Sequence, residues 1–158
     1  MNNIVYELIV IGGGISSCTF VSDLLAKGFK GKIAIIETGR NLGGRCSSRI
    51  SKKNSGWIIN HGSPNFNIIN NSNDLKLNNF VNQLLKKNII KKDESSLIGL
   101  DNNLNFSTDL TNEFCTGNIY SSTSFMGDLA NQILNLNNKN NQVDIYFQEL
   151  IIDLSFHK

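Results

Sequence analysis

Three consecutive glycines at positions 12–14 constrain the fold of this chain more than any other feature. They follow Leu8–Ile11, an apolar and β-branched segment that is too short for a buried helix and predicts a fully buried strand. Apolar residues then recur at helical spacing over residues 15–27, and Gly28 is placed to end that helix. The sequence therefore predicts a strand that is joined to a helix by a glycine-rich turn.

Such a turn leaves the first backbone amides of the helix without partners in the helix, at a point where the helix dipole adds positive potential. A phosphate group suits this position. Gly12 would make the tight turn, Gly14 would let a pyrophosphate approach the backbone, and Ser17 stands where the G-x-G-x-x-G motif has its third glycine. Taken alone, the match is equally consistent with an ordinary glycine turn in an α/β protein.

A second apolar segment, residues 32–37, ends in the carboxylate of Glu37. Two parallel strands around one helix make a βαβ unit, whose right-handed crossover brings the carboxyl end of the second strand beside the glycine turn. Glu37 follows Gly12 by about 25 residues, near the ~20 expected for a carboxylate that binds the adenosine ribose. It would repel a 2′-phosphate, whereas Arg40 nearby could accommodate one. A solvated charge at a strand end is the alternative.

A second glycine pair, Gly43 and Gly44, is followed by the arginines Arg45 and Arg49. Glycine permits a backbone conformation or a close approach that side chains forbid, and arginine supplies cationic hydrogen-bond donors. Together these residues could close over a diphosphate. A solvated basic loop is the alternative.

These motifs together resemble the FAD-dependent amine oxidase superfamily and, within it, the renalase-like NAD(P)/FAD-dependent oxidoreductases. Members carry I-G-x-G-I-x-G after the first strand and then E-x-x-x-x-x-G-G-R, and this chain has I-G-G-G-I-S-S at residues 11–17 and E-T-G-R-N-L-G-G-R at residues 37–45. A third motif, D-H-G-A-x-x-F, is similar to N-H-G-S-P-N-F at residues 60–66, with Asn60 replacing the aspartate and Ser63 the alanine. The resemblance covers three motifs in the first 66 residues.

The resemblance implies that the cofactor is FAD. The residues that it places at the cofactor are Gly12, Gly14, Ser16, Glu37, Gly43, Gly44, Arg45, His61, Gly62 and Ser63. The first three would face the pyrophosphate, and Glu37 would hold the adenosine ribose. Residues 43–45 would lie along the cofactor beyond the pyrophosphate, and residues 61–63 towards the flavin ring.

No catalytic residue is assigned. The amide of Asn60 cannot supply the charge that an aspartate would bring. His61 is a donor to the flavin, a titrating group, or a histidine that simply packs at a strand end. No metal ligand set is predicted.

The resemblance further implies an α/β fold, namely an FAD-binding, Rossmann-like nucleotide domain of the glutathione-reductase type with a parallel sheet, plus part of an α+β region on the substrate side. We expect residues 1–66 to form the βαβ core and a cofactor-covering loop, residues 67–124 a partial substrate-side segment, and residues 125–158 a return to the nucleotide domain. A half-exposed strand expected over residues 152–156 would have an open edge, which favours a chain truncated at its carboxyl end.

Periodicity and turn signals predict the remaining elements. These are a helix over residues 74–88, short strands over 89–90, 97–100 and 104–106 with a hairpin turn at 101–103, a helix capped by Ser124 that runs to residue 134, and a third parallel strand over 143–147.

Composition excludes several other classes of protein. The 158 residues suffice for one domain, and a net charge of +2 with scattered lysines forms no patch for nucleic acid or a membrane surface. Cys18, Cys46 and Cys115 are odd in number and far apart, so they indicate neither a disulfide framework nor a zinc site and favour a reducing cytoplasm. No apolar run approaches the roughly 20 residues of a membrane span.

The preferred hypothesis is an enzyme, the FAD-binding portion of a flavin-dependent oxidoreductase that takes a hydride from an amine or a reduced nucleotide. Its partners would be a small-molecule substrate and a separately encoded carboxy-terminal half. The alternative is a non-catalytic FAD- or NAD-binding module or a degenerate fragment of such an enzyme. An NAD-dependent reductase is disfavoured, because the motif at residues 43–45 has no role in simple NAD binding.

Overall fold

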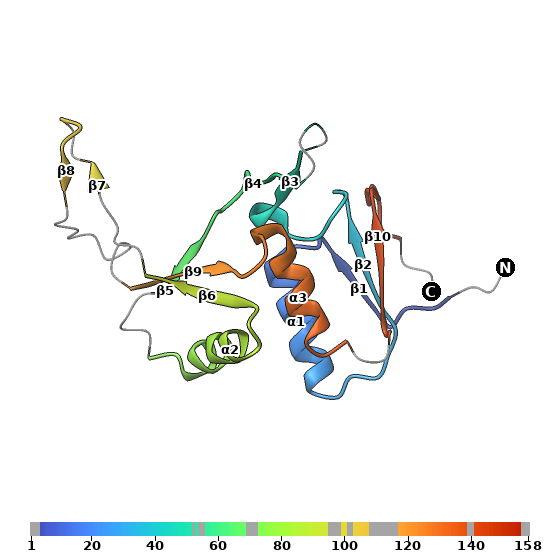
Figure 1. Ribbon diagram of the computed structural model, residues 1–158. Helices are drawn as coiled ribbons and strands as arrows, with labels where there is room; N and C mark the ends of the chain where they lie inside the picture. The colour runs from blue at the N-terminus through green and yellow to red at the C-terminus, as the bar shows by residue number, and fades with distance from the viewer. Residues whose placement is uncertain are drawn as a thin grey trace. The chain divides into compact units, whose positions relative to one another are not determined.

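The computed structural model describes residues 4–51, 53, 56–68, 73–94, 99–100, 103–107, 117–138 and 141–155 (Figure 1). Its contacts divide the chain into two compact units. Unit one comprises Met1–Ser63 and Phe125–Lys158, and unit two comprises Pro64–Ser124. Within the described ranges, no helix is both long and apolar enough to cross a membrane.

Unit one contains a parallel sheet, two α-helices and a short hairpin. Its elements in chain order are β1 (Leu8–Ile11), α1 (Ile15–Ala26), β2 (Ile33–Glu37), the 3₁₀ turn η1 (Gly44–Cys46), β3 (Ser48–Ile50), β4 (Ile58–Asn60), the 3₁₀ turn η3 (Met126–Asp128), α3 (Leu129–Asn135) and β10 (Val143–Phe147).

The parallel sheet has the strand order β1-β2-β10. In its register Leu8 and Val143 both lie opposite Ile33, one on each side of β2. The predicted βαβ unit and the predicted third parallel strand over residues 143–147 are thus confirmed, and so is the α/β fold class. Gly28, at φ +91°, follows the end of α1 as the sequence predicts.

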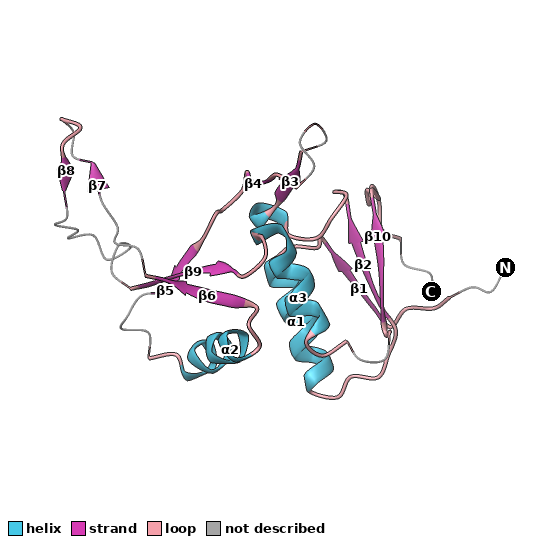
Figure 2. Ribbon diagram, in the orientation of Figure 1, coloured by secondary structure: helices cyan, strands magenta, loops and turns pink. Residues whose placement is uncertain are grey.

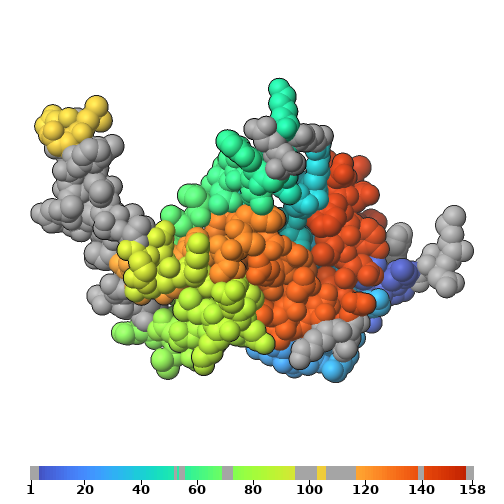
Figure 3. Space-filling model, in the orientation of Figure 1, coloured from blue at the N-terminus to red at the C-terminus, as the bar shows by residue number. Residues whose placement is uncertain are grey.

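The core of unit one lies between the sheet and the helices α1 and α3, which cover the same face of the sheet (Figure 2). Every second residue of each strand points to this side. The fully buried apolar side chains include Cys18, Val21, Ile33, Ile35 and Ala130. In Figure 3 α3, drawn in orange, forms part of the outer surface of this unit, where the polar residues Asn131 and Asn135 are exposed.

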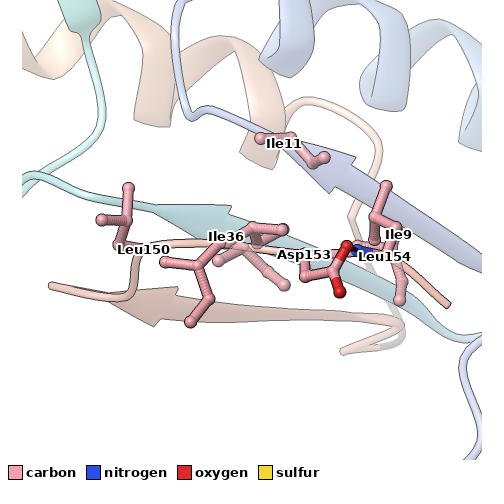
Figure 4. Close-up of a pocket in the computed structure, with 8 residues that line it drawn as sticks. Ile9, Ile11, Ile36, Leu150, Asp153 and Leu154 are labelled. Carbon is pink, nitrogen blue, oxygen red and sulfur yellow. Dashed lines mark hydrogen bonds between the residues drawn. The ribbon is translucent and has the colours of Figure 1, made fainter.

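The opposite face of the sheet is open along β1. Ile9 is 52% exposed and Ile11 is 61% exposed, so β1 is half-buried and the prediction of a fully buried strand is wrong. The reason is that both helices of the unit cover the other face. The segment 150–154 lies against this open face, where it lines a cavity of about 450 Å³ together with Ile9, Ile11 and Ile36 (Figure 4).

Residues 151–155 do not pair as a strand, so the strand predicted over residues 152–156 is wrong for the part that the structure describes. A local hydrogen bond replaces the ladder at this point. The backbone amide of Leu154 donates to Oδ1 of Asp153 at 2.8 Å. Short polar side chains compete with sheet pairing in this way.

The helix predicted to begin at Ser124 begins later. A 3₁₀ turn opens at Met126 with Phe125 as its N-cap residue, and α3 starts only at Leu129. The N-cap residue of the 3₁₀ turn is Phe125 and that of α3 is Asp128, so the prediction of Ser124 as the N-cap residue is wrong.

Unit two is an antiparallel sheet with one helix. Its elements are β5 (Phe66–Ile68), α2 (Leu75–Lys86), β6 (Ile90–Asp93), β7 (Gly99–Leu100), β8 (Phe106–Ser107) and β9 (Asn118–Ser122). The sheet has the order β5-β9-β6, and β7 pairs separately with β8. The sequence predicted β6, β7 and β8 to within a few residues but missed β5 and β9, and residues 101 and 102 of the expected hairpin turn lie outside the described residues.

The helix predicted over residues 74–88 is α2. Oδ1 of Asp74, its N-cap residue, accepts hydrogen bonds from the amides of Lys76 at 2.9 Å and Leu77 at 3.1 Å. A side-chain acceptor at this position satisfies amides that have no partner within the helix. Val81 and Leu84 are buried on the apolar face of the helix.

Replacement of Ile35 by alanine should lower the free energy of unfolding by about 2–5 kcal/mol, because the side chain is fully buried and leaves a cavity. The matched replacement of Ile9, on the open face of the same sheet, should cost clearly less. Denaturant unfolding followed by far-UV circular dichroism measures both values. Equal losses for the two variants would contradict the assignment of the core to the helical side.

Candidate functional site

The glycine turn between β1 and α1 has the conformation that its sequence predicts. Gly12 has φ +89°, a value that side-chain-bearing residues rarely adopt, and its amide donates to the carbonyl of Ile36 at 2.8 Å. Gly14 is the N-cap residue of α1 and makes no side-chain cap. The first turn of α1 itself contains no acidic residue.

Glu37 ties this turn to the end of β2. Its Oε2 accepts a hydrogen bond from the Gly13 amide, and its Oε1 accepts one from the Gly39 amide, both at 2.6 Å. A carboxylate offers about four lone-pair positions, and the Thr38 hydroxyl adds only a long contact of 3.5 Å to Oε1, so acceptor capacity remains after these bonds. The carboxylate that the resemblance assigns to a ribose thus also anchors the backbone, a role that the sequence did not reveal.

The second glycine pair packs directly on the first turn. The amide of Gly43 donates to the carbonyl of Gly13 at 2.9 Å, and Gly14 and Gly43 form a parallel bridge. Gly43 and Gly44 have φ values of +127° and +53°, and a Cβ atom on Gly44 would lie 3.3 Å from the Cα atom of Gly14. Glycine is therefore required here both by conformation and by the close approach of two backbones.

Arg45 lies in η1 directly after this pair, and its side chain is exposed. Ser16, in the first turn of α1, is exposed as well. Neither side chain is held by a hydrogen bond or an ion pair to the residues that the structure describes. Both are sterically free to meet a ligand at this end of the unit.

Residues 61–63 are held against η1 through the backbone. The amide of Gly62 donates to the carbonyl of Ser47 at 3.1 Å, and the amide of Ser63 donates to the carbonyl of Arg45 at 2.8 Å. A Cβ atom on Gly62 would collide with the carbonyl oxygen of Arg45. The side chain of His61 is exposed.

The structure thus brings Gly12, Gly14, Glu37, Gly43 and Gly44 together at the start of α1, and residues 61–63 lie beside the next turn. Sequence reasoning missed Gly127, at which a Cβ atom would lie 2.7 Å from the amide nitrogen of Ser48. The available signal was a single glycine just before a helical pattern, which by itself does not reveal a close contact.

The two described cysteines show no sign of a reactive thiol. Burial and, to a smaller extent, the nearby carboxylate of Glu37 together raise the pKa of the Cys18 thiol to about 11. Burial also raises the pKa of Cys46, against the opposing effect of Arg45. Both thiols are therefore protonated at neutral pH, and Cys115 lies outside the described residues.

The geometry suits a negatively charged, extended ligand that carries a hydroxylated group. A helix start with a bare glycine can receive a phosphate. A Cβ atom on Gly14 would meet no atom within 4 Å, so the structure leaves open space at this residue. The carboxylate of Glu37, at the adjacent strand end, can accept hydrogen bonds from hydroxyl groups.

Comparison with known proteins agrees with this geometry. The family described as an NAD(P)-binding Rossmann-like domain matches residues 10–84. Residues 10–84 are thus similar to that family, and the chain has a Rossmann-like α/β fold built on the parallel sheet β1-β2-β10.

Among solved structures, the crystal structure of Thermovibrio ammonificans THI4 matches with 11% sequence identity and a TM-score of 0.45. The match covers 90% of this chain and 37% of that one, so the chain spans little more than a third of the length of that protein. No curated protein matches the sequence.

Replacement of Gly62 by alanine should destabilise unit one by about 2–3 kcal/mol, because the new methyl group must displace the backbone carbonyl of Arg45. The neighbouring change His61→Ala, at an exposed side chain, should stay within about 0.5 kcal/mol of wild type. Thermal and denaturant unfolding report both effects. An unchanged stability of G62A would contradict the close packing of these two turns.

Proposed function

We propose that this chain is the FAD-binding portion of a flavin-dependent oxidoreductase that resembles renalase and the amine oxidases. The observation that carries the proposal is the arrangement of three backbone turns around one carboxylate. Glu37 joins Gly13 to Gly39, and the pair Gly43–Gly44 rests on the same glycine turn. A simple NAD site has no need of the second glycine pair.

The residues present fit such a cofactor. The helix start at Gly14 would receive the pyrophosphate, for which the missing side chain leaves room. The unused acceptor positions of Glu37 would take the two ribose hydroxyls of the adenosine. The exposed guanidinium of Arg45 and the first-turn residue Ser16 would contact the cofactor from the two sides of the turn.

The cofactor would supply hydride acceptance from an amine or a reduced nucleotide. The residues of this chain would bind the nucleotide, fix its orientation and hold residues 61–63 towards the flavin ring. The side chain of His61 in that segment is exposed. The substrate would be a small molecule, and we place the protein in the cytoplasm.

A second candidate function is a binding module without turnover that takes up NAD(P) or FAD. The description of the matching family, an NAD(P)-binding Rossmann-like domain, favours it. The two candidates differ in which dinucleotide binds. They also differ in whether the bound cofactor is reduced by any donor.

Replacement of Gly14 by alanine should weaken FAD binding at least about tenfold, because the methyl group would occupy the space assigned to the pyrophosphate. Its effect on stability should be about 1 kcal/mol or less, the difference between glycine and alanine at an N-cap. Titration followed by flavin absorbance and fluorescence measures the affinity, and NADH and NADPH titrations serve as comparisons. A wild-type chain that takes up NADPH but no FAD would overturn the flavin assignment in favour of the second candidate.

Replacement of Glu37 by alanine should weaken FAD binding about tenfold and also lower the free energy of unfolding by about 1–3 kcal/mol, because two backbone amides lose their acceptor. The control is Thr38→Ala, at the next residue, which removes only an exposed and long contact to the same carboxylate. Affinity is measured below the melting temperature of each variant. An unchanged affinity in E37A would refute the ribose role while leaving the anchoring role in place.

A further inference from the structure

A closed ring of hydrogen bonds joins the hairpin β3–β4 to the turn that precedes α3. The Gly127 amide donates to the Ser48 hydroxyl oxygen at 2.8 Å, and the Ser48 hydroxyl donates to Oδ1 of Asn60 at 2.7 Å. The Met126 amide donates to the same Oδ1 at 3.2 Å. Met126 and Gly127 are consecutive, so their two amides, the Ser48 hydroxyl and the Asn60 side-chain oxygen form a closed ring within unit one.

The donors in this ring determine how the Asn60 amide is oriented. A backbone amide can only donate, so the atom that faces Met126 must be the side-chain oxygen of Asn60. The serine hydroxyl has one proton, and since it accepts from Gly127, that proton is available to Asn60. Asn60 thus acts through its oxygen as a double acceptor. A carboxylate at this position could accept the same two bonds.

The ring lies next to the second glycine turn and to residues 61–63. Ser48 follows η1 by two residues, and Asn60 stands two residues before Gly62, whose backbone holds the carbonyl of Ser47. Gly127 also packs closely against Ser48. A Cβ atom on Gly127 would lie 2.7 Å from the amide nitrogen of Ser48 and 3.0 Å from its hydroxyl oxygen. The carbonyl of Gly127 in turn lies 3.0 Å from the Cβ position of Gly43.

We propose that Ser48 and Asn60 are positioning residues of the dinucleotide site, which hold the turn of residues 43–45 against Gly14 before the ligand arrives. The inference rests on the proposed function and adds two residues to it. Affinity in this view depends on the acceptor oxygen of Asn60 and not on a charge at that position. A turn that is already held in its bound conformation loses less entropy when the ligand binds.

The experiment compares FAD affinity and melting temperature in the full chain for wild type, Asn60→Leu, Asn60→Asp and Ser48→Ala. N60L and S48A should bind FAD about tenfold more weakly, because hydrogen bonds that hold the turn are lost. N60D should bind within about twofold of wild type, since its carboxylate retains both acceptor functions.

The matched control is Asn137→Leu, which removes a hydrogen bond of the same kind, from Asn137 Nδ2 to the Ser22 hydroxyl at 3.0 Å, on the helical side of the same unit. N137L should lower the melting temperature but leave FAD affinity as in wild type. Amide hydrogen exchange adds a readout that needs no ligand, and N60L should accelerate exchange at Cys46 and Ser47 relative to α1.

The outcomes separate the inference from the proposed function. A wild-type chain that binds no dinucleotide overturns the proposed function. A wild-type chain that binds FAD, with N60L binding equally tightly, overturns only the positioning role of Asn60. Equal losses of affinity in N60L and N137L would show a general effect of stability and would also overturn the positioning role of Asn60. A loss of affinity in N60D as large as that in N60L would overturn the role of the acceptor oxygen.

Discussion

The carboxylate of Glu37 is the point on which the site of this protein depends. Its two oxygens accept the amides of Gly13 and Gly39, and its backbone carbonyl accepts the amide of Glu149 at 3.2 Å. One residue at the end of β2 therefore joins the glycine turn, the following loop and the segment after β10. Bonds between a charged acceptor and backbone amides are stronger than neutral ones, so the geometry of this strand end is well defined.

Glycine serves two distinct purposes around this carboxylate. At Gly12 and Gly44 the backbone has a positive φ that other residues adopt at a cost, whereas at Gly62 and Gly127 the neighbouring backbone leaves no room for a Cβ atom. Gly14 belongs to neither group, since its φ is −76° and a Cβ atom there would meet nothing within 4 Å. Open space beside a glycine that the fold does not require is the feature that favours a ligand at this residue.

Several elements were predictable because local sequence alone specifies them. The helix α2 has an apolar face at helical spacing and an N-cap aspartate, and the β1-α1-β2 unit has buried-strand patterns around a glycine turn. The strands β5 and β9 escaped prediction, because their short segments are defined by pairing with each other, Phe66 opposite Tyr120, across a long stretch of sequence. The strand expected over residues 152–156 failed because Asp153 offers the backbone a local acceptor.

The sequence by itself determined the class of fold and the residues that gather at the start of α1, since periodicity, glycine positions and the spacing from Gly12 to Glu37 are local properties of the chain. Only the tertiary structure decided what those residues contact. In the tertiary structure Glu37 accepts hydrogen bonds from two backbone amides, and Ile9 and Ile11 of β1 are exposed. The hydrogen-bond ring through Ser48 and Asn60 also forms only there. Such contacts join residues as far apart as Ser48 and Gly127, and no local pattern encodes a pairing over that separation.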